Sequence, residues 1–266
     1  MQHLRIEVAD RIAVVVLDNP PVNAQPPALW AELAQAFDEL GERADVAVTI
    51  LTGAGRVFSA GADLVSQAAP EPEAAVWRRL RACREATYAI LEHRHPVVGA
   101  VNGPAVGLGV SLLACCDMLV CADHASLSLP ELSVGLVGGA RHAMRILSPA
   151  AVRHLFFTGR RMDAQEMYRR GLVERCVPAD ELMAAARDIA GAIAAQTPQA
   201  LRIAKETFRA IESMTLRDGY RYEQDRLVEL SRTEEAREAL SAFLEKRAPV
   251  FRRASAAPAI RTDPGP

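Results

Sequence analysis

Two short apolar runs, each followed at once by a glycine-bearing loop, constrain the fold of this chain more than any other feature. The first run is 46–51 (VAVTIL), and its loop begins with Thr52-Gly53. The second run is 97–101 (VVGAV), and its loop begins at 102–104. Continuous apolar runs of this length are typical of strands that are covered on both faces. The chain therefore needs other elements packed against both sides of these strands.

Helical patterns separate the predicted strands. Apolar residues from Leu29 to Leu40 recur at helical spacing after Pro26 and stop at Gly41, a suitable C-cap. A second amphipathic helix is predicted to begin at Pro72. Further helices are predicted over 138–156, 163–170 and 179–195, and further strands over 4–8, 11–17, 118–122 and 173–177. Alternation of strand and helix indicates the α/β class.

The C-terminal part of the chain has a different pattern. No strand signal follows 197–198, and helices rich in Arg and Glu are predicted over 199–213, 215–230 and 233–246. The 266 residues correspond to about 1.8 domains at roughly 150 residues each. We therefore expect a core over 1–195 and a helical region over 196–251. Residues 252–266 are rich in Ala, Pro and Arg without apolar periodicity, which predicts a flexible tail.

Composition and charge exclude several classes of protein. The chain has 31 Lys and Arg against 33 Asp and Glu, so it lacks the basic footprint of a nucleic-acid binder. Residues 97–116 are apolar enough to suggest a membrane span, but Asn102-Gly103-Pro104 divides them into a strand, a loop and a helix. The first ten residues lack the apolar segment of a secretory signal, and five cysteines without metal spacing are typical of reduced thiols. We expect a cytoplasmic protein that binds neither nucleic acid nor membrane.

Two glycine-bearing loops offer backbone N–H groups to a bound oxygen. The first runs over 53–63 and the second over 102–109. A dinucleotide fingerprint needs a third glycine where Phe58 stands, and no Gly-Lys-Ser/Thr phosphate loop is present. Glycine permits close backbone approach, with N–H groups free to point at an oxygen. Glycines after strands are more often plain turns, so this geometry alone does not specify a function.

Several motifs follow one another in an order that resembles the crotonase (enoyl-CoA hydratase/isomerase) superfamily. They are 58–64 (FSAGADL), 96–109 (PVVGAVNGPAVGLG), 116–118 (CDM) and 129–131 (LPE), with 19–24 (NPPVNA) near the start and 241–247 (SAFLEKR) near the end. The resemblance implies a crotonase-like spiral of ββα turns in the α/β class. It also implies a C-terminal α-helical trimerisation region, with trimers that often stack as hexamers. The expected partner is an acyl-CoA thioester, with no tightly bound cofactor and with coenzyme A as part of the substrate.

The resemblance also implies which residues bind the thioester. The backbone N–H groups of Ala62 and Leu108 match an oxyanion hole, in which each donor is worth about 2.7–4 kcal/mol in the transition state. Leu108 departs from the glycine usual there, but only its N–H group is needed. The residues expected to contact coenzyme A are Ala24, Ala60, Gly61, Asp63, Leu64, Phe243 and Lys246. For Lys246, a solvated lysine at a helix end stays an open alternative.

The catalytic carboxylates depart from the family pattern. A typical hydratase of this family has two glutamates; Glu131 matches the second, and Ser111 stands in place of the first. Serine is not a general base near neutral pH without assistance, although it can hydrogen-bond a water molecule. We expect an enoyl-CoA hydratase-type enzyme, a lyase of fatty-acid or related acyl-CoA metabolism, in which Glu131 is the acid/base. The structural alternatives are an acid at a helix N-terminus for Glu131 and simple packing beside Cys115 for Ser111.

Other functions stay open on the sequence. A Δ3,Δ2-enoyl-CoA isomerase needs only Glu131, and the loss of the first glutamate is also compatible with a catalytically silent acyl-CoA binding protein. The family's hydroxycinnamoyl-CoA hydratase-lyases similarly pair serine with glutamate, but their phenol-binding tyrosines are not clearly matched here. A serine hydrolase is disfavoured because Ser111 is not in a G-x-S-x-G elbow. No metal is expected, because the histidines lack ligand spacing and His93 and His95 fit a solvated strand edge.

Overall fold

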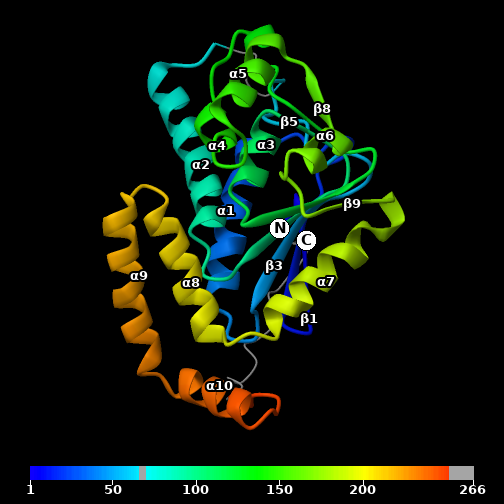
Figure 1. The fold of residues 1–266 in the computed structure, drawn as a ribbon. Helices are drawn as coiled ribbons and strands as arrows, with labels where there is room; N and C mark the ends of the chain where they lie inside the picture. Colours follow the sequence, from blue (N-terminus) through cyan, green and yellow to red (C-terminus); the bar gives the residue numbers. More distant parts are fainter. Residues whose placement is uncertain (66–69, 252–266) are drawn as a thin grey trace.

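The computed structural model describes residues 1–65 and 70–251, and strands and helices alternate along its first 195 residues (Figure 1). A six-stranded sheet has the order β1-β2-β3-β4-β6-β9, in which β1 and β2 are antiparallel and the other neighbours are parallel. Its strands are β1 (Leu4–Ala9), β2 (Ile12–Leu17), β3 (Val48–Gly53), β4 (Val97–Val101), β6 (Met118–Ala122) and β9 (Arg175–Val177). A smaller sheet of order β5-β7-β8 comprises β5 (Pro104–Val106), β7 (Ser126–Ser128) and β8 (Arg161–Asp163).

The two faces of the large sheet are buried against different helices, which explains the continuous apolar runs. Val48 and Ile50 of β3 pack in one cluster with Ala186 of α7 (Leu182–Ala194). Leu51 of the same strand lies in the other cluster, together with Phe37 of α1 (Pro27–Glu42). Because successive side chains of a strand point to opposite faces, both alternate sets must be apolar. The predicted burial of 46–51 and 97–101 on both faces is confirmed.

The apolar stretch 97–116 is divided into a strand and a helix as predicted, but the segment predicted as a loop between them contains a further strand. It forms β4, then β5 of the smaller sheet, and then α3 (Leu108–Ala114). In the described part of the chain, no helix has both the length and the apolar character needed to cross a bilayer.

The prediction of one helix over 138–156 is wrong. The structure has α4 (Ala140–Ala143), a turn, and then α5 (Pro149–Thr158). Ser148 caps α5, because its hydroxyl accepts a hydrogen bond from the Ala151 N–H at 3.3 Å. Pro149 disfavours helical geometry at the residue before it and is well suited to the first position of a new helix. The Ser-Pro pair therefore starts a second helix where apolar periodicity alone suggests continuation.

The predicted solvated edge at His93 and His95 is also wrong. Both side chains are buried, and only 4% and 5% of their surfaces are exposed. His93 packs edge-on against Phe37 at 5.1 Å between ring centres, and its Nε2 is 3.1 Å from the Thr49 hydroxyl. Burial lowers the pKa of His95 to about 4, so this ring is neutral at physiological pH. The two histidines, which stand between α2 (Glu73–Leu91) and β4 in the sequence, are core residues.

The C-terminal residues form the predicted helices. They are α8 (Pro198–Ile211), α9 (Leu216–Ser231) and α10 (Glu234–Leu244), and α8 packs beside α9 (Figure 1). Thr215 and Thr233 cap α9 and α10 through hydrogen bonds to the first-turn N–H groups. The remaining elements are α6 (Ala164–Arg169) and the short 3₁₀ helices η1 (Glu131–Val134) and η2 (Ala179–Glu181). The predicted tail over 252–266 lies outside the described residues.

Candidate active site

The two glycine-bearing loops meet beside the start of α3. The Val106 N–H donates to the Ser59 carbonyl at 2.9 Å, and Ser59 forms a parallel bridge with Ala105. Gly61 has a φ of +86°, and a Cβ there would lie 2.7 Å from the Val106 carbonyl oxygen and 3.4 Å from the Leu108 nitrogen. A side chain has no room at the first of these distances, and this φ favours glycine. Gly61 is therefore required for the close approach of the two loops.

The backbone N–H groups of Ala62 and Leu108 have no acceptor among the residues that the structure describes. Gln25 bonds to both neighbours of Ala62: its N–H donates to the Gly61 carbonyl at 2.8 Å, and its carbonyl accepts from the Asp63 N–H at 3.1 Å. Adjacent residues of an extended segment direct their N–H groups to opposite sides, so the Ala62 N–H points away from Gln25. Leu108 is the first residue of α3, where an N–H has no acceptor inside the helix. Both groups are available to a ligand.

Gly107 explains why leucine is tolerated at position 108. The sharp turn into α3 uses a φ of +53° at Gly107, whose N–H donates to the Ser128 carbonyl at 2.9 Å. Leu108 follows this turn and is already part of the helix. The unusual backbone conformation is therefore carried by the glycine before it, and the departure from the family residue does not remove the N–H donor.

Glu131 lies directly against this turn. It follows Pro130 in the first turn of η1, and its Oε1 is 3.0 Å from the position that a Cβ of Gly107 would occupy. The carboxyl group is half-buried, and loss of water contact raises its pKa above the ordinary value for glutamate. Its Oε2 is buried without a hydrogen-bond partner among the described residues. An unpaired, partly desolvated carboxyl group with a raised pKa is suited to proton transfer.

Ser111 faces the same place from the second turn of α3. Its side chain is buried, and its hydroxyl oxygen has no hydrogen-bond partner within the described ranges. Gly139, which has a φ of +75°, lies beside both the Ser111 hydroxyl and the Glu131 carboxyl group. A Cβ at Gly139 would lie 2.9 Å from the Ser111 Oγ and 3.9 Å from the Glu131 Oε1. Buried polar atoms normally have partners, so a small polar group bound here would satisfy both side chains.

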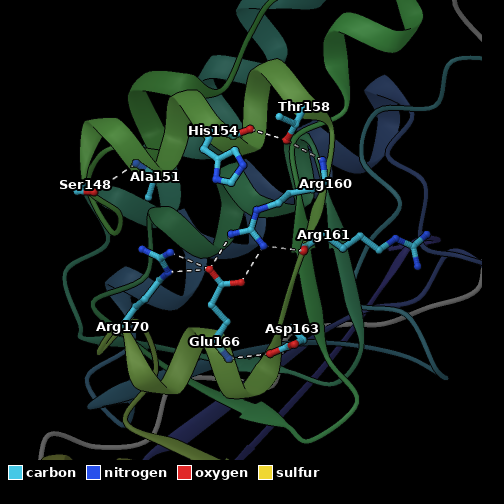
Figure 2. Close-up of polar contacts among 9 residues, drawn as sticks. All are labelled: Ser148, Ala151, His154, Thr158, Arg160, Arg161, Asp163, Glu166 and Arg170. Carbon is cyan, nitrogen blue, oxygen red and sulfur yellow. Dashed lines mark hydrogen bonds and ion pairs between the residues drawn. The ribbon is translucent and has the colours of Figure 1, made fainter.

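A network of charged side chains joins Arg160, Glu166 and Arg170 (Figure 2). Glu166 of α6 accepts from Arg160 at 2.6 and 2.8 Å and from Arg170 at 2.8 Å. These hydrogen bonds lower the pKa of Glu166 to about 2. Gly159, next to Arg160, has a φ of +63°, and a Cβ there would lie 3.8 Å from the Cα of Pro130. The network therefore begins next to a glycine that lies close to Pro130.

Three polar side chains that were not predicted from the sequence support the first loop. The Gln25 amide donates to the Ser59 hydroxyl at 2.8 Å, and that hydroxyl donates to the Asn23 carbonyl at 2.7 Å. The Asn23 amide in turn donates to the Val57 carbonyl at 2.8 Å. All three polar side chains are buried. Polar residues at 23 and 25, in a segment between a strand and a helix, are the signal that indicates such a support.

The residues expected to contact coenzyme A fall into two separate groups. Ala60, Gly61, Asp63 and Leu64 lie on the first loop beside Ala62, and Ala24 lies next to the Gln25 bridge. Phe243 lies on α10 and Lys246 lies just beyond its end, both exposed. In Figure 1, α10 is at the opposite end of the molecule from α3. The structure of one chain therefore does not bring Phe243 and Lys246 to the loop.

Gly107 and Gly139 were not predicted as site residues. Gly107 stands in the quoted motif 96–109, and Gly139 belongs to the pair 138–139. In the sequence, Gly139 is recognisable only as one member of a glycine pair, because its distance from Ser111 depends on the packing of α3 against α4. Among the described residues, no cluster of three or more His, Cys, Asp or Glu side chains is arranged to hold a metal ion.

Comparison with known proteins shows which family the chain resembles. Residues 7–254 match the family model described as enoyl-CoA hydratase/isomerase. The chain is 38% identical over 222 residues to a methyl-dioxo-hexahydro-indene-carboxyl-CoA hydrolase of Rhodococcus jostii, covering 84% of this chain and 86% of the relative. It is 35% identical over 259 residues to a carnitinyl-CoA dehydratase of Proteus mirabilis, covering 94% of this chain and 98% of the relative.

A solved enoyl-CoA hydratase of Bacillus anthracis has the same fold. The TM-score is 0.89 at 33% identity, and the match covers 94% of this chain and 99% of that chain. The expected crotonase-like α/β fold with C-terminal helices is thereby confirmed. Because the family model spans most of the chain and two relatives exceed 30% identity over most of their length, the chain belongs to the enoyl-CoA hydratase/isomerase family.

Proposed function

We propose that this member of the family is an enoyl-CoA hydratase-type enzyme that uses Glu131 as its single acid/base. The observation that carries this proposal is the meeting of Glu131 and Ser111 at Gly139, next to the backbone N–H groups of Ala62 and Leu108. The names of the relatives, a carnitinyl-CoA dehydratase and a CoA-ester hydrolase, support a reaction on an acyl-CoA thioester.

The two N–H groups act on the thioester oxygen. As water adds to C3 of an enoyl-CoA, negative charge moves through C2 to the thioester oxygen, where Ala62 and Leu108 donate hydrogen bonds. Each donor of this kind contributes about 2.7–4 kcal/mol to the transition state. Both amides are held by backbone contacts of their own loops, so little reorganisation is needed when the charge develops.

Glu131 moves the proton. In its ionised form it accepts a proton from the attacking water as the water oxygen bonds to C3, and it then returns that proton to C2. The net result is addition of one water across the C2=C3 bond, with Glu131 restored. Ser111 is within reach of the same water position, and its hydroxyl donates or accepts a hydrogen bond that orients the water. Burial raises the pKa of Glu131, which strengthens it as a base near neutral pH.

A Δ3,Δ2-enoyl-CoA isomerase is the second candidate, favoured because Ser111 stands in place of the first family glutamate and Glu131 alone suffices for that reaction. In that reaction Glu131 takes a proton from C2 and returns it to C4, while the same two N–H groups stabilise the enolate. A catalytically silent acyl-CoA binding protein would use the loop and the amides but not the carboxylate.

The assay that tests these functions follows the absorbance of the conjugated thioester. Purified protein is incubated with crotonyl-CoA and, separately, with a 3-enoyl-CoA, and Glu131→Gln is run beside the wild type. Hydration lowers the absorbance of crotonyl-CoA, whereas isomerisation of the 3-enoyl-CoA raises it. We expect the wild-type activity to fall by about 10²–10⁴-fold in Glu131→Gln. Saturable binding of the thioesters without turnover of a substrate panel would instead support the binding protein.

The proposed assembly is a homotrimer or a dimer of trimers. The C-terminal helices carry strongly exposed apolar side chains, among them Leu216 at 92% and Phe243 at 78% exposure. Apolar residues gathered on one helical region are typical of an interaction surface. Because α10 lies away from α3 within one chain, the proposed contacts of Phe243 and Lys246 with coenzyme A need a second copy. Sedimentation equilibrium of wild type and Phe243→Glu tests this: we expect the variant to dissociate.

A further inference from the structure

The C-terminal end of α3 is held by Arg145. The last carbonyl groups of a helix have no partner within that helix. The Arg145 Nη1 donates to the carbonyl oxygen of Ala114, the final residue of α3. A cation at this end also interacts favourably with the helix dipole. The contact lies at the opposite end of the helix from Leu108, the proposed oxyanion donor.

Arg145 is itself fixed by Glu212, the residue that follows α8. The Arg145 Nη2 donates to Oε1 of Glu212 at 2.6 Å, and its Nε donates to Oε2 at 3.1 Å. A bidentate pair of this kind fixes the orientation of the guanidinium group as well as its distance. Only 16% of the Arg145 side chain is exposed, so the pair is partly shielded from water. The pair thus connects α3 to the C-terminal helices.

A second contact joins α8 to the same end of α3. Lys205 of α8 is buried, and its Nζ donates to Asp117 Oδ2 at 2.9 Å and to the His95 carbonyl at 3.0 Å. Asp117 follows α3 by three residues, and its Oδ2 also accepts from the Val97 N–H at 2.6 Å. Two side-chain contacts made by different residues therefore place α8 against the end of α3.

We infer that Arg145, held by Glu212, is a positioning residue that sets where α3 presents the Leu108 N–H and the Ser111 hydroxyl. The inference rests on the proposed function, because it assigns these two groups to an acyl-CoA. The helix has seven residues and is about 10 Å long, so a tilt at one end displaces the other. A misplacement of about 1 Å at a reacting group can cost about 10²-fold in rate.

The test compares Glu212→Gln and Arg145→Lys with Glu206→Gln, all in the full chain. Glu206 is an exposed carboxylate on α8 and serves as the matched control. In Glu212→Gln we expect kcat for the thioester to fall by about 10–10²-fold. KM should change by less than about threefold, because the coenzyme A contacts lie elsewhere. Arg145→Lys keeps a cation that can reach Ala114, so its loss should be smaller, and Glu206→Gln should match the wild type.

Hydrogen–deuterium exchange of the amides of 108–114 separates this inference from the proposed function. We expect faster exchange in Glu212→Gln than in the wild type, and no change in Glu206→Gln. An unchanged kcat in folded Glu212→Gln overturns the inference. If the wild type turns over no thioester, the proposed function fails, and exchange alone then decides: faster exchange in Glu212→Gln alone supports the positioning role, and equal exchange in both variants refutes it.

Discussion

Gly139→Ala is the substitution that addresses the proposed water position most directly. The new methyl group would lie 2.9 Å from the Ser111 Oγ and 3.9 Å from the Glu131 Oε1, so it occupies the place where both side chains meet. Holding alanine at a φ of +75° costs roughly 1–2 kcal/mol. A natural domain is stable by about 5–15 kcal/mol, so the variant should fold.

The expected effect on catalysis is much larger than the effect on folding. Losing the positioned water should lower the rate of crotonyl-CoA hydration by about 10²–10⁴-fold, which equals about 2.7–5.4 kcal/mol of transition-state free energy. Isomerisation of a 3-enoyl-CoA needs no water, so it should fall by less than about tenfold. The conjugated-thioester absorbance reports both reactions, and urea unfolding reports the stability.

Two further glycine variants separate the effect of backbone strain from the effect of the added methyl group. Gly171→Ala places alanine at a φ of +69° with nothing within 4 Å, so it tests backbone strain alone. Gly138→Ala adds a methyl group beside Gly139, again with nothing within 4 Å and without a positive φ. Both should hydrate crotonyl-CoA at the wild-type rate. If folded Gly139→Ala also kept that rate, Ser111 and Glu131 would not share a water position and the proposed mechanism would be refuted.

Three further results are expected. Ser111→Glu should raise crotonyl-CoA hydration by about tenfold or more, and a folded variant without a gain in the absorbance assay would contradict the argument that hydration is limited by the missing first glutamate. Because burial raises the folded-state pKa of Glu131, its ionisation destabilises the folded protein as pH rises. Glu131→Gln should therefore have a higher Tm than wild type at pH about 8, and this difference in Tm should vanish below pH about 4. If the two proteins had equal Tm values at both pH values, a raised folded-state pKa of Glu131 would be excluded. Lys205→Met removes a buried ammonium group that donates to the His95 carbonyl and to Asp117, whose side chain is 31% exposed. The loss of these contacts should cost about 1–3 kcal/mol in urea unfolding, whereas an unchanged midpoint would show that they are dispensable.

Local patterns account for the parts of the fold that the sequence predicts correctly. The runs at 46–51 and 97–101 are apolar on both alternating faces, as expected for strands that are buried against α1 on one side and α7 on the other. The break at Ser148-Pro149 is also a local signal, but the apolar periodicity around it obscured the cap. His93 and His95 are different: their burial depends on α1, which is distant in the sequence, so no local pattern reveals it.

In the candidate site, the sequence likewise identifies individual residues but not their arrangement in space. Glu131, Ala62 and Leu108 are identified by their motifs, since each stands in a quoted segment, and Ser111 follows the segment 96–109 by two residues. Their mutual placement depends on contacts between the loop of 53–63, α3 and the segment before α4, which motif spacing does not specify. The contact between Arg145 and Glu212 cannot be predicted from the motifs either, because these residues are 67 positions apart in the sequence.

Three glycines with positive φ explain how one chain places these groups so closely. A Cβ at Gly61 would approach the Leu108 nitrogen, one at Gly107 would approach the Glu131 Oε1, and one at Gly139 would approach the Ser111 Oγ. Each glycine therefore leaves the main chain open beside one of the groups proposed to act on the substrate. Since only glycine adopts these conformations readily, the same positions that permit the loop geometry also leave room beside the groups proposed to react. Serine at 111 leaves this main-chain frame intact, because none of the three glycines depends on the side chain at 111; we therefore propose that the frame is compatible with more than one acyl-CoA reaction and that the side chain at 111 influences which one occurs.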